Sequence, residues 1–227
     1  MTRKGSAQPD AAARTSIMNA AGRIVIDLFT TLDGVAQAPG GPEEDPSDDF
    51  PFGGWQAPLI DEAVGAGVDE AMRDMDGLLL GRRTYDIFAG YWPHHTTGPE
   101  GAIGQLFNRI PKYVATRDPG YPLEWEGSNR IGDNLAAEIA ELRTRHRQVN
   151  VIGSVDFVQT LLAERLYDEL RMWVYPIVLG TGKKVFPTGA APANLRLTTP
   201  PVVSDRGAVL LRYAPEPGIP QTGTMGE

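Results

Sequence analysis

The sequence predicts an α/β fold with a central, mostly parallel β-sheet and antiparallel strands at its C-terminal end. Short apolar runs, which are typical of buried strands, alternate with segments whose apolar residues recur at helical spacing. Near the C-terminus, strand-like runs at 168–179 and 209–213 follow each other with no helical pattern between them. The 227 residues, of which 41% are hydrophobic, suffice for one such domain with a sizeable core.

Each element follows from a local pattern. The first strand is the apolar run 24–29, which Asp27 interrupts, and a long loop rich in proline, glycine and acids follows over 33–58. Helices and strands then alternate along the chain. The predicted strands cover 77–80, ending at Gly81, then 112–116 and 149–152. The predicted helices cover 59–73, 83–90, a segment from the cap Asp133 to His146, and 155–163 with Ser154 as its cap. We expect a flexible extension over 1–22, one folded domain over 23–214 and a flexible tail over 215–227.

Composition excludes several classes of function. The absence of cysteine excludes a disulfide scaffold, cysteine-ligated zinc, iron–sulfur clusters and a thiol nucleophile. A formal net charge of -8, from 21 basic and 29 acidic residues, disfavours nucleic acid and anionic membranes as partners. No apolar stretch approaches the about 20 residues of a membrane span, and no secretory signal is visible, so we expect a cytoplasmic protein. With only three histidines, two of them adjacent, we expect no metal site.

Two strand ends have the composition of phosphate-binding sites. In segment 80–85, Leu-Gly-Arg-Arg-Thr-Tyr, a glycine at a strand end precedes two arginines and a hydroxyl at a helix start. In segment 151–155, Val-Ile-Gly-Ser-Val, a buried strand runs into a capped helix. Glycine lets a ligand approach the backbone, helix N-termini attract anions and arginine forks onto phosphate. An ordinary helix start is the alternative for each, but both lie at the carboxyl edge of a parallel sheet, where ligands bind.

Two further features allow more than one interpretation. Asp27 lies in an otherwise apolar strand, and a buried carboxylate must be paired, protonated or part of a site; a solvent-facing position or an internal ion pair is the alternative. Segment 180–185, Gly-Thr-Gly-Lys-Lys-Val, imitates a dinucleotide-binding glycine motif. It lacks the third glycine and no helix follows, so we interpret it as a turn that ends a strand.

Six segments of the sequence form an ordered series: Thr31-Leu32-Asp33-Gly34, Gly53-Gly54-Trp55, Leu80-Gly81-Arg82-Arg83-Thr84-Tyr85, Pro111-Lys112-Tyr113-Val114-Ala115-Thr116, Val151-Ile152-Gly153-Ser154 and Pro176-Ile177-Val178-Leu179-Gly180-Thr181-Gly182-Lys183. Taken in this order, they resemble the dihydrofolate-reductase-like family, and more narrowly its branch related to the C-terminal reductase domain of riboflavin biosynthesis. The resemblance covers about residues 22–214. It implies a three-layer fold, NADPH bound across the strand ends and a homodimer.

The resemblance also assigns candidate residues. The residues implied for the cofactor phosphates are Gly81, Arg82, Arg83 and Thr84, and Arg82 would be the partner of the 2′-phosphate. The diphosphate would bind at Gly153, Ser154 and Val155. Thr116 and Arg117 would border the adenosine. Asp27, Thr31 and Asp33 would lie near the substrate and the nicotinamide. The acid that folate reductases carry early in the next helix is matched by Asp61, displaced by one residue, which is a helical rotation of about 100°.

The function that the resemblance implies is an NADPH-dependent reductase similar to the 5-amino-6-(5-phosphoribosylamino)uracil reductase of riboflavin biosynthesis. Its substrate would be a pyrimidine- or pterin-like small molecule, with no nucleic acid or membrane as partner. Dihydrofolate reductase is one alternative, and a non-catalytic, dimeric NADPH- or nucleotide-binding module is another. Because the chain has no cysteine, the cysteine-ligated zinc deaminase domain that often accompanies riboflavin-pathway reductases is not expected in it.

Overall fold

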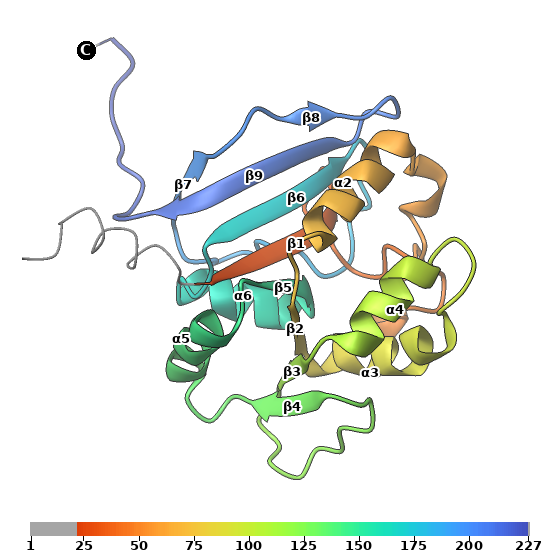
Figure 1. Cartoon of the computed structure of the whole chain (residues 1–227). Coiled ribbons are helices and arrows are strands. Elements are labelled where there is room, and N and C mark those ends of the chain that lie inside the picture. The colour runs from red at the N-terminus through yellow and green to blue at the C-terminus, as the bar shows by residue number, and fades with distance from the viewer. Residues whose placement is uncertain (1–21, 227) are drawn as a thin grey trace, which may run out of the picture.

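The computed structural model describes residues 22–226, which form a nine-stranded sheet with helices on both faces (Figure 1). The strands are β1 (Arg23–Thr31), β2 (Gly77–Gly81), β3 (Lys112–Ala115), β4 (Ser128–Ile131), β5 (Gln148–Gly153), β6 (Glu169–Tyr175), β7 (Asn194–Leu197), β8 (Val202–Val203) and β9 (Val209–Glu216). Their order is β4-β3-β2-β5-β1-β6-β9-β7, and β8 also pairs with β9. All pairings from β4 to β6 are parallel and all pairings of β9 are antiparallel, which confirms the predicted fold class.

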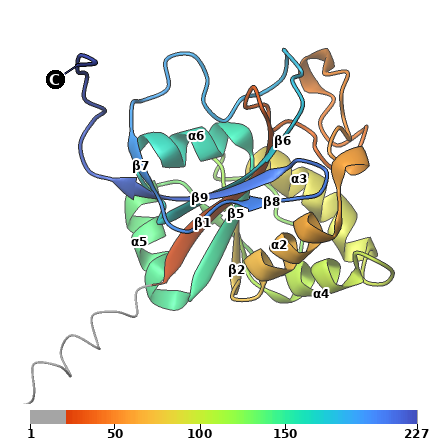
Figure 2. The same cartoon turned by 90° about the horizontal axis from the view of Figure 1, so that it is seen from above.

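Helices connect the strands on both sides of the sheet. The α-helices of the described residues are α2 (Glu62–Met72), α3 (Arg82–Tyr91), α4 (Gly101–Arg109), α5 (Leu135–Arg145) and α6 (Val155–Ala163). Short 3-10 helices lie at η1 (Ser47–Asp49), η2 (Ala57–Leu59) and η3 (Trp92–His94). Figure 2 shows α5 and α6 on one side of the sheet and α2 and α4 on the other. Within the described residues, no helix has the length and apolar character needed to cross a membrane.

The alternation of side chains along β1 decides what faces each layer. Ile24, Ile26 and Leu28 are buried in the core beneath α5 and α6. Because successive side chains of a strand point to opposite faces, Asp27 and Phe29 face the side covered by α2, α3 and α4. The one carboxylate in the middle of β1 is thereby directed to the same side as the long loop and α2.

The parallel direction of six strands gathers their last residues at one edge of the sheet. These residues are Thr31 of β1, Gly81 of β2, Ala115 of β3, Ile131 of β4, Gly153 of β5 and Tyr175 of β6. Strand β5 lies between β2 and β1, so the glycine-ended strands β2 and β5 are neighbours beside β1. Segments that are far apart in the sequence therefore meet at the edge where ligands bind in open α/β sheets.

Two predicted boundaries were wrong for reasons of hydrogen bonding. The helix predicted over 59–73 begins at Glu62, because Asp61 caps it by accepting the backbone N–H of Val64 at 3.1 Å. Helix α5 is capped by Asn134 and not by Asp133, whose carboxylate instead pairs with Arg130. Polar residues at both positions can cap a helix, and composition does not say which one does.

The strand predicted over 168–179 was also too long. It ends at Tyr175, because Pro176 has no N–H to continue the ladder. Conversely, β9 continues to Glu216, so the tail expected over 215–227 starts inside a strand. Strands β4, β7 and β8 and helix α4 were not predicted. The expected extension over 1–22 lies outside the described residues except for Gly22, whose N–H donates to the carbonyl of Arg143 at 2.7 Å.

Candidate functional site

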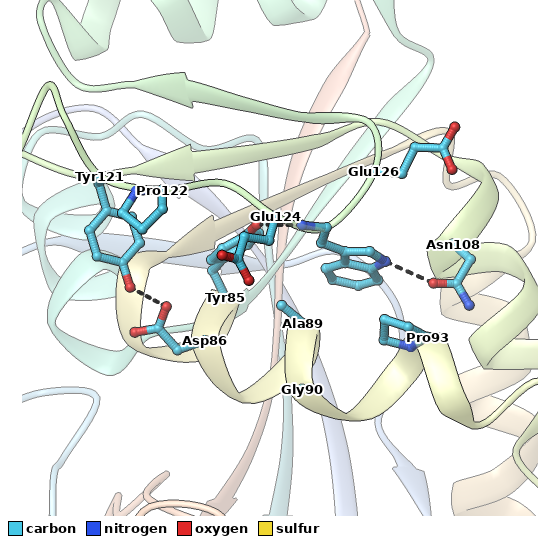
Figure 3. A pocket seen from close by; sticks show the side chains of 11 residues that line it. Tyr85, Asp86, Ala89, Gly90, Pro93, Asn108, Tyr121, Pro122, Glu124 and Glu126 are labelled. Atoms are coloured by element: carbon cyan, nitrogen blue, oxygen red, sulfur yellow. Dashed lines mark hydrogen bonds between the residues drawn. The ribbon is translucent and has the colours of Figure 1, made fainter.

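Two cavities formed by residues 22–226 differ in their relation to the predicted site, and the larger one lies where the sequence places its candidate residues. The smaller, of about 630 Å³, lies between α3 and the loop 121–126 (Figure 3). Two pairs of its polar groups are bonded to each other: the Tyr121 hydroxyl donates to Asp86, and the Trp125 indole donates to Asn108 at 2.8 Å. Tyr85, at the end of segment 80–85, lines this cavity, but none of the predicted catalytic or cofactor-binding residues does.

The larger cavity, of about 1030 Å³, lies at the carboxyl edge of the sheet. Strands β1 and β5 supply a group of residues that we call the floor: Asp27, Phe29, Asn150 and Ile152. The end of β5 and the first turns of α3 and α6 supply Arg83, Thr84, Gly153, Ser154 and Val155. The loop after β1 supplies residues 36–45 and Gln56, and the remaining wall comes mainly from α2, α3, η3 and α4.

The two glycine-ended strands approach each other closely at this cavity. A Cβ on Gly81 would collide with the Ser154 hydroxyl, and a Cβ on Gly153 would lie 2.6 Å from Oγ1 of Thr84. Gly153 also has φ +148°, a conformation that other residues rarely adopt. Ser154 occupies the N-cap position of α6, as predicted, but its side chain makes no capping bond. Within the described part of the chain, no side chain therefore caps the first backbone N–H groups of α6, and this segment lines the cavity, as a cradle for an anion would require.

An acidic side chain holds the two cations of this cavity. Asp45, from the long loop, lies 2.8 Å from Arg83 and 2.7 Å from Nζ of Lys183. Burial opposes ionisation of this carboxyl, but hydrogen bonds from Lys183, Ser47 and Arg83 outweigh it and lower the pKa of Asp45 to about 2. The loop is further fixed by Gln37, whose amide oxygen accepts the backbone N–H of Lys183 at 3.0 Å.

Asp27 brings a second kind of chemistry to the floor. Burial raises the pKa of its carboxyl to about 6, although the positive charge of Arg171 on β6 opposes the shift. Asp27 and Arg171 are register partners between β1 and β6, and Arg171 is held at 2.5 Å by Glu169. The carboxyl is thus both part of a cavity wall and next to an internal ion pair. It can exchange a proton near neutral pH, and when ionised it can accept hydrogen bonds from a ligand.

Two other candidate acids have their oxygens engaged elsewhere. Asp33 accepts the Thr31 hydroxyl at 2.6 Å and the N–H groups of Leu179 and Gly180 at 3.2 and 2.9 Å. Burial opposes ionisation, but these bonds lower the pKa of Asp33 to about 2. Thr31 in turn accepts the N–H of Val35 at 3.0 Å. Both side chains fasten the loop 176–184 and the turn after β1, and neither lines the cavity.

Asp61 likewise lies outside the cavity lining. Its carboxylate caps α2 through Val64 and also accepts the backbone N–H of Arg206 at 3.0 Å. The bond from Val64 is the main reason that the pKa of Asp61 is lowered. Asp61 therefore does not line the cavity that contains Asp27.

The remaining cofactor candidates lie around the cavity rather than in its wall. Arg82 is exposed at the start of α3, with its guanidinium 5.5 Å from the centre of the Tyr121 ring. Thr116 and Arg117 follow β3, where the Thr116 hydroxyl accepts the N–H of Asp118 at 3.2 Å. Strand β3 is the neighbour of β2, so these residues and Arg82 lie at the same edge of the sheet.

Among the lining residues that sequence reasoning did not assign to the site are four with polar side chains: Gln37, Asp45, Asn150 and Lys183. Asn150 breaks the apolar run of β5 as Asp27 breaks that of β1, and that signal could have identified it. Gln37, Asp45 and Lys183 come from irregular loops. Their meeting depends on loop conformation, for which the sequence offers no periodicity to interpret.

Known proteins resemble this chain over the same region. The RibD C-terminal domain family matches residues 23–206. The uncharacterized protein YyaP of Bacillus subtilis (strain 168) is 26% identical over 196 residues, which cover 84% of this chain and 94% of the relative.

Solved structures share the fold at low sequence identity. A deaminase/5-amino-6-(5-phosphoribosylamino)uracil reductase of Thermotoga maritima has a TM-score of 0.56 at 15% identity, over 89% of this chain and 59% of that one. Dihydrofolate reductase of Enterococcus faecalis, complexed with NADP(H), has a TM-score of 0.53 at 13% identity, over 87% and 98%. These likenesses confirm the dihydrofolate-reductase-like fold that the sequence motifs predicted.

Proposed function

The chain belongs to the RibD C-terminal domain family, and from this premise we propose that it is an NADPH-dependent reductase of a pyrimidine- or pterin-like heterocycle. The observation that carries the proposal is that one cavity is lined both by the uncapped start of α6 at Gly153 and by the carboxyl of Asp27, whose pKa is raised by burial. The first suits a diphosphate and the second suits the polar edge of a nitrogen heterocycle. A reductase needs both ligands side by side.

The residues present fit the cofactor that the family implies. Gly153, Ser154 and Val155, at the start of α6, would hold the diphosphate, with Gly81 leaving room for Ser154. On the neighbouring helix α3, Arg83 and Thr84 line the same cavity, and at its start Arg82 would pair with the 2′-phosphate. Thr116 and Arg117, after β3, would border the adenosine. When bound, the reduced nicotinamide supplies the hydride, and the protein supplies binding, orientation and charge.

The floor would hold the substrate. An ionised Asp27 can accept two hydrogen bonds from an amino-pyrimidine edge, and Asn150 on the adjacent strand β5 offers both a donor and an acceptor. Asn150 is itself oriented, because its side chain donates to the carbonyl of Ala71 at 3.3 Å and accepts from Gln148 at 2.9 Å. A protonated Asp27 can instead give its proton to a ring nitrogen as hydride reaches the adjacent carbon.

The long loop would exclude water from the reacting atoms. Its residues 36–45 line the cavity, and its buried Trp55 is anchored by an indole bond of 2.8 Å to the carbonyl of Gln37. Its acidic residues place negative charge beside the ligand, and Asp45 ties the loop to α3 through Arg83. The Trp55–Gln37 bond joins two parts of the loop to each other, so the loop can open and close as a unit over the strand ends when the Asp45–Arg83 pair separates.

The test is the consumption of NADPH with a panel of reducible pyrimidines and pterins. We expect at least one compound to give a saturable rate and a product that carries two additional hydrogen atoms, identified by mass spectrometry. Saturable NADPH binding with no oxidation across the panel would contradict the reductase and support a non-catalytic nucleotide-binding module. The expected homodimer and the cytoplasmic location stay predictions.

A further inference from the structure

The large cavity carries an unusual balance of charge. Seven of the residues that line it are acids: Asp27, Glu43, Glu44, Asp45, Asp69, Glu100 and Asp156. Among the described residues, one arginine and one lysine line the cavity, Arg83 and Lys183, and Asp45 forms an ion pair with each. Arg83 stands beside Thr84 and Gly153, so these cations belong to the end proposed for the cofactor.

The other end of the cavity is mainly apolar. The side chains that α2, α3, η3 and α4 contribute there form what we call the apolar arm: Val64, Val68, Met72, Ile87, Phe88, Trp92, Ile103 and Phe107. Among the described residues of these elements and their flanks, the acids that line the cavity are Asp69 and Glu100, and the lysine or arginine that lines it is Arg83, at the first turn of α3. A ligand group lying along this arm meets hydrocarbon and negative charge.

Buried arginines near the floor do not change this balance. Arg171 and Arg212 lie on β6 and β9, on the face that carries Asp27, but neither lines the cavity. Arg171 is bonded to Glu169 at 2.5 Å, and Arg212 to Glu70 at 2.6 Å. Each guanidinium is thus already paired with a carboxylate of the protein, although Nε of Arg212 has no hydrogen-bond partner among the described residues.

Resting on the proposed function, we propose that the substrate is an unphosphorylated heterocycle, neutral or cationic, with an apolar substituent that lies along the apolar arm. A phosphate dianion placed there would lose its hydration without gaining a guanidinium or ammonium partner, and burying an unpaired charge is costly. This distinguishes the chain from the Thermotoga maritima enzyme, whose substrate carries a phosphoribosyl group. An apolar substituent would instead gain from the burial of its own surface and that of Val68, Phe88 and Phe107.

The experiment measures dissociation constants by calorimetry in the full-length protein saturated with NADP⁺, so that no turnover occurs. The probes are 5-amino-6-(5-phosphoribosylamino)uracil, its dephosphorylated form and a pterin with a benzyl substituent. We expect the dephosphorylated probe to bind at least as tightly as the phosphorylated one, and the benzyl pterin to bind about tenfold more tightly than unsubstituted pterin.

A designed cation provides the matched comparison. Val68→Lys places an ammonium in the apolar arm, whereas Ala66→Lys places the same charge on an exposed position of α2 that does not line the cavity. We expect Val68→Lys alone to favour the phosphorylated probe, by about tenfold relative to the dephosphorylated one.

The possible failures are separable. If NADP⁺ does not bind, the proposed function is wrong and the substrate proposal falls with it. If NADP⁺ binds but the wild-type protein prefers the phosphorylated probe by tenfold or more, or if benzyl pterin gains nothing over pterin, only the substrate proposal is overturned.

Discussion

Asp27 of β1 lies opposite Arg171 of β6 in the parallel register, on the sheet face beneath α2. The guanidinium does not fully offset the cost of burying the carboxylate, because Glu169 binds Arg171 and adds negative charge. The result is a carboxyl whose pKa is raised from 3.8 to about 6 in the wall of the cavity. Burial of this kind favours the protonated form and is common at functional sites.

The first prediction concerns stability against pH. Because the folded protein holds the Asp27 proton up to about pH 6 and the unfolded chain releases it near 3.8, stability from this group falls as pH rises through that window. The loss amounts to about 3 kcal/mol at 1.36 kcal/mol per pKa unit. Asp27→Asn should flatten the decline between pH 4 and 6 in urea unfolding. An unchanged pH slope in the variant would contradict the assigned pKa.

The second prediction concerns Gly153. Alanine there would combine an unfavourable φ of +148° with a contact to Thr84, so we expect a loss of about 1–3 kcal/mol of stability and much weaker NADPH binding. Gly90→Ala is the control, since a Cβ at this helical position meets no atom within 4 Å, and it should be neutral or stabilising. Thermal unfolding and calorimetry would check both variants. Normal NADPH affinity in Gly153→Ala would mean that the diphosphate binds elsewhere.

The third prediction concerns cofactor choice. Arg82 is exposed at the start of α3 and is free to fork onto a 2′-phosphate. Arg82→Ala should weaken NADPH by about 1.5–3 kcal/mol and leave NADH almost unchanged, whereas Arg109→Ala, at an exposed position in the last turn of α4, should affect neither. Equal losses for NADPH and NADH in calorimetry would assign the 2′-phosphate to another residue.

The fourth prediction concerns the ion pairs of Asp45. In Asp45→Asn, Arg83 and Lys183 lose their shared carboxylate and become available to cofactor phosphates. We expect NADPH to bind about tenfold more tightly at low ionic strength, with the gain shrinking as salt is added. Asp48→Asn removes the same charge from an exposed position of the same loop and should change affinity little. Weaker NADPH binding in Asp45→Asn would show that the Asp45 contacts support the cofactor site instead of competing for it.

The sequence predicted most of the sheet because buried strands leave continuous apolar runs, such as Ile24–Ile26 in β1 and Leu78–Leu80 in β2. Strand β4 escaped prediction, because only Ile131 of its residues is buried and no alternation develops. Helix α4 escaped because two glycines, Gly101 and Gly104, interrupt its nine residues. Both glycines are buried against neighbouring backbone, at Thr96 and His95. This packing, and not the helix propensity of glycine, accounts for the helix.

The candidate site was predictable where it lies on regular elements. Gly153 and Asp27 are the clearest examples, because a glycine at a strand end and an acid in an apolar strand can be recognised in the sequence itself. The partnership of Asp45 with Lys183 joins residues 138 positions apart through two irregular loops, and no local pattern encodes it. Asp61 shows the opposite case. Its position near the start of a helix resembled that of a folate-reductase acid, but in the structure it caps α2.

The measurement that tests the central claim most directly compares initial rates of NADPH oxidation by the wild-type protein and Asp27→Asn, with an unphosphorylated pyrimidine that carries an apolar substituent and with dihydrofolate. We expect the wild-type protein to reduce the pyrimidine and to turn over dihydrofolate weakly or not at all. Asp27→Asn should lose tenfold or more in kcat/KM for the pyrimidine, at about 1.4 kcal/mol per factor of ten, with an unchanged Kd for NADPH. Rapid turnover of dihydrofolate that is indifferent to Asp27→Asn would contradict this account and identify the protein as a dihydrofolate reductase.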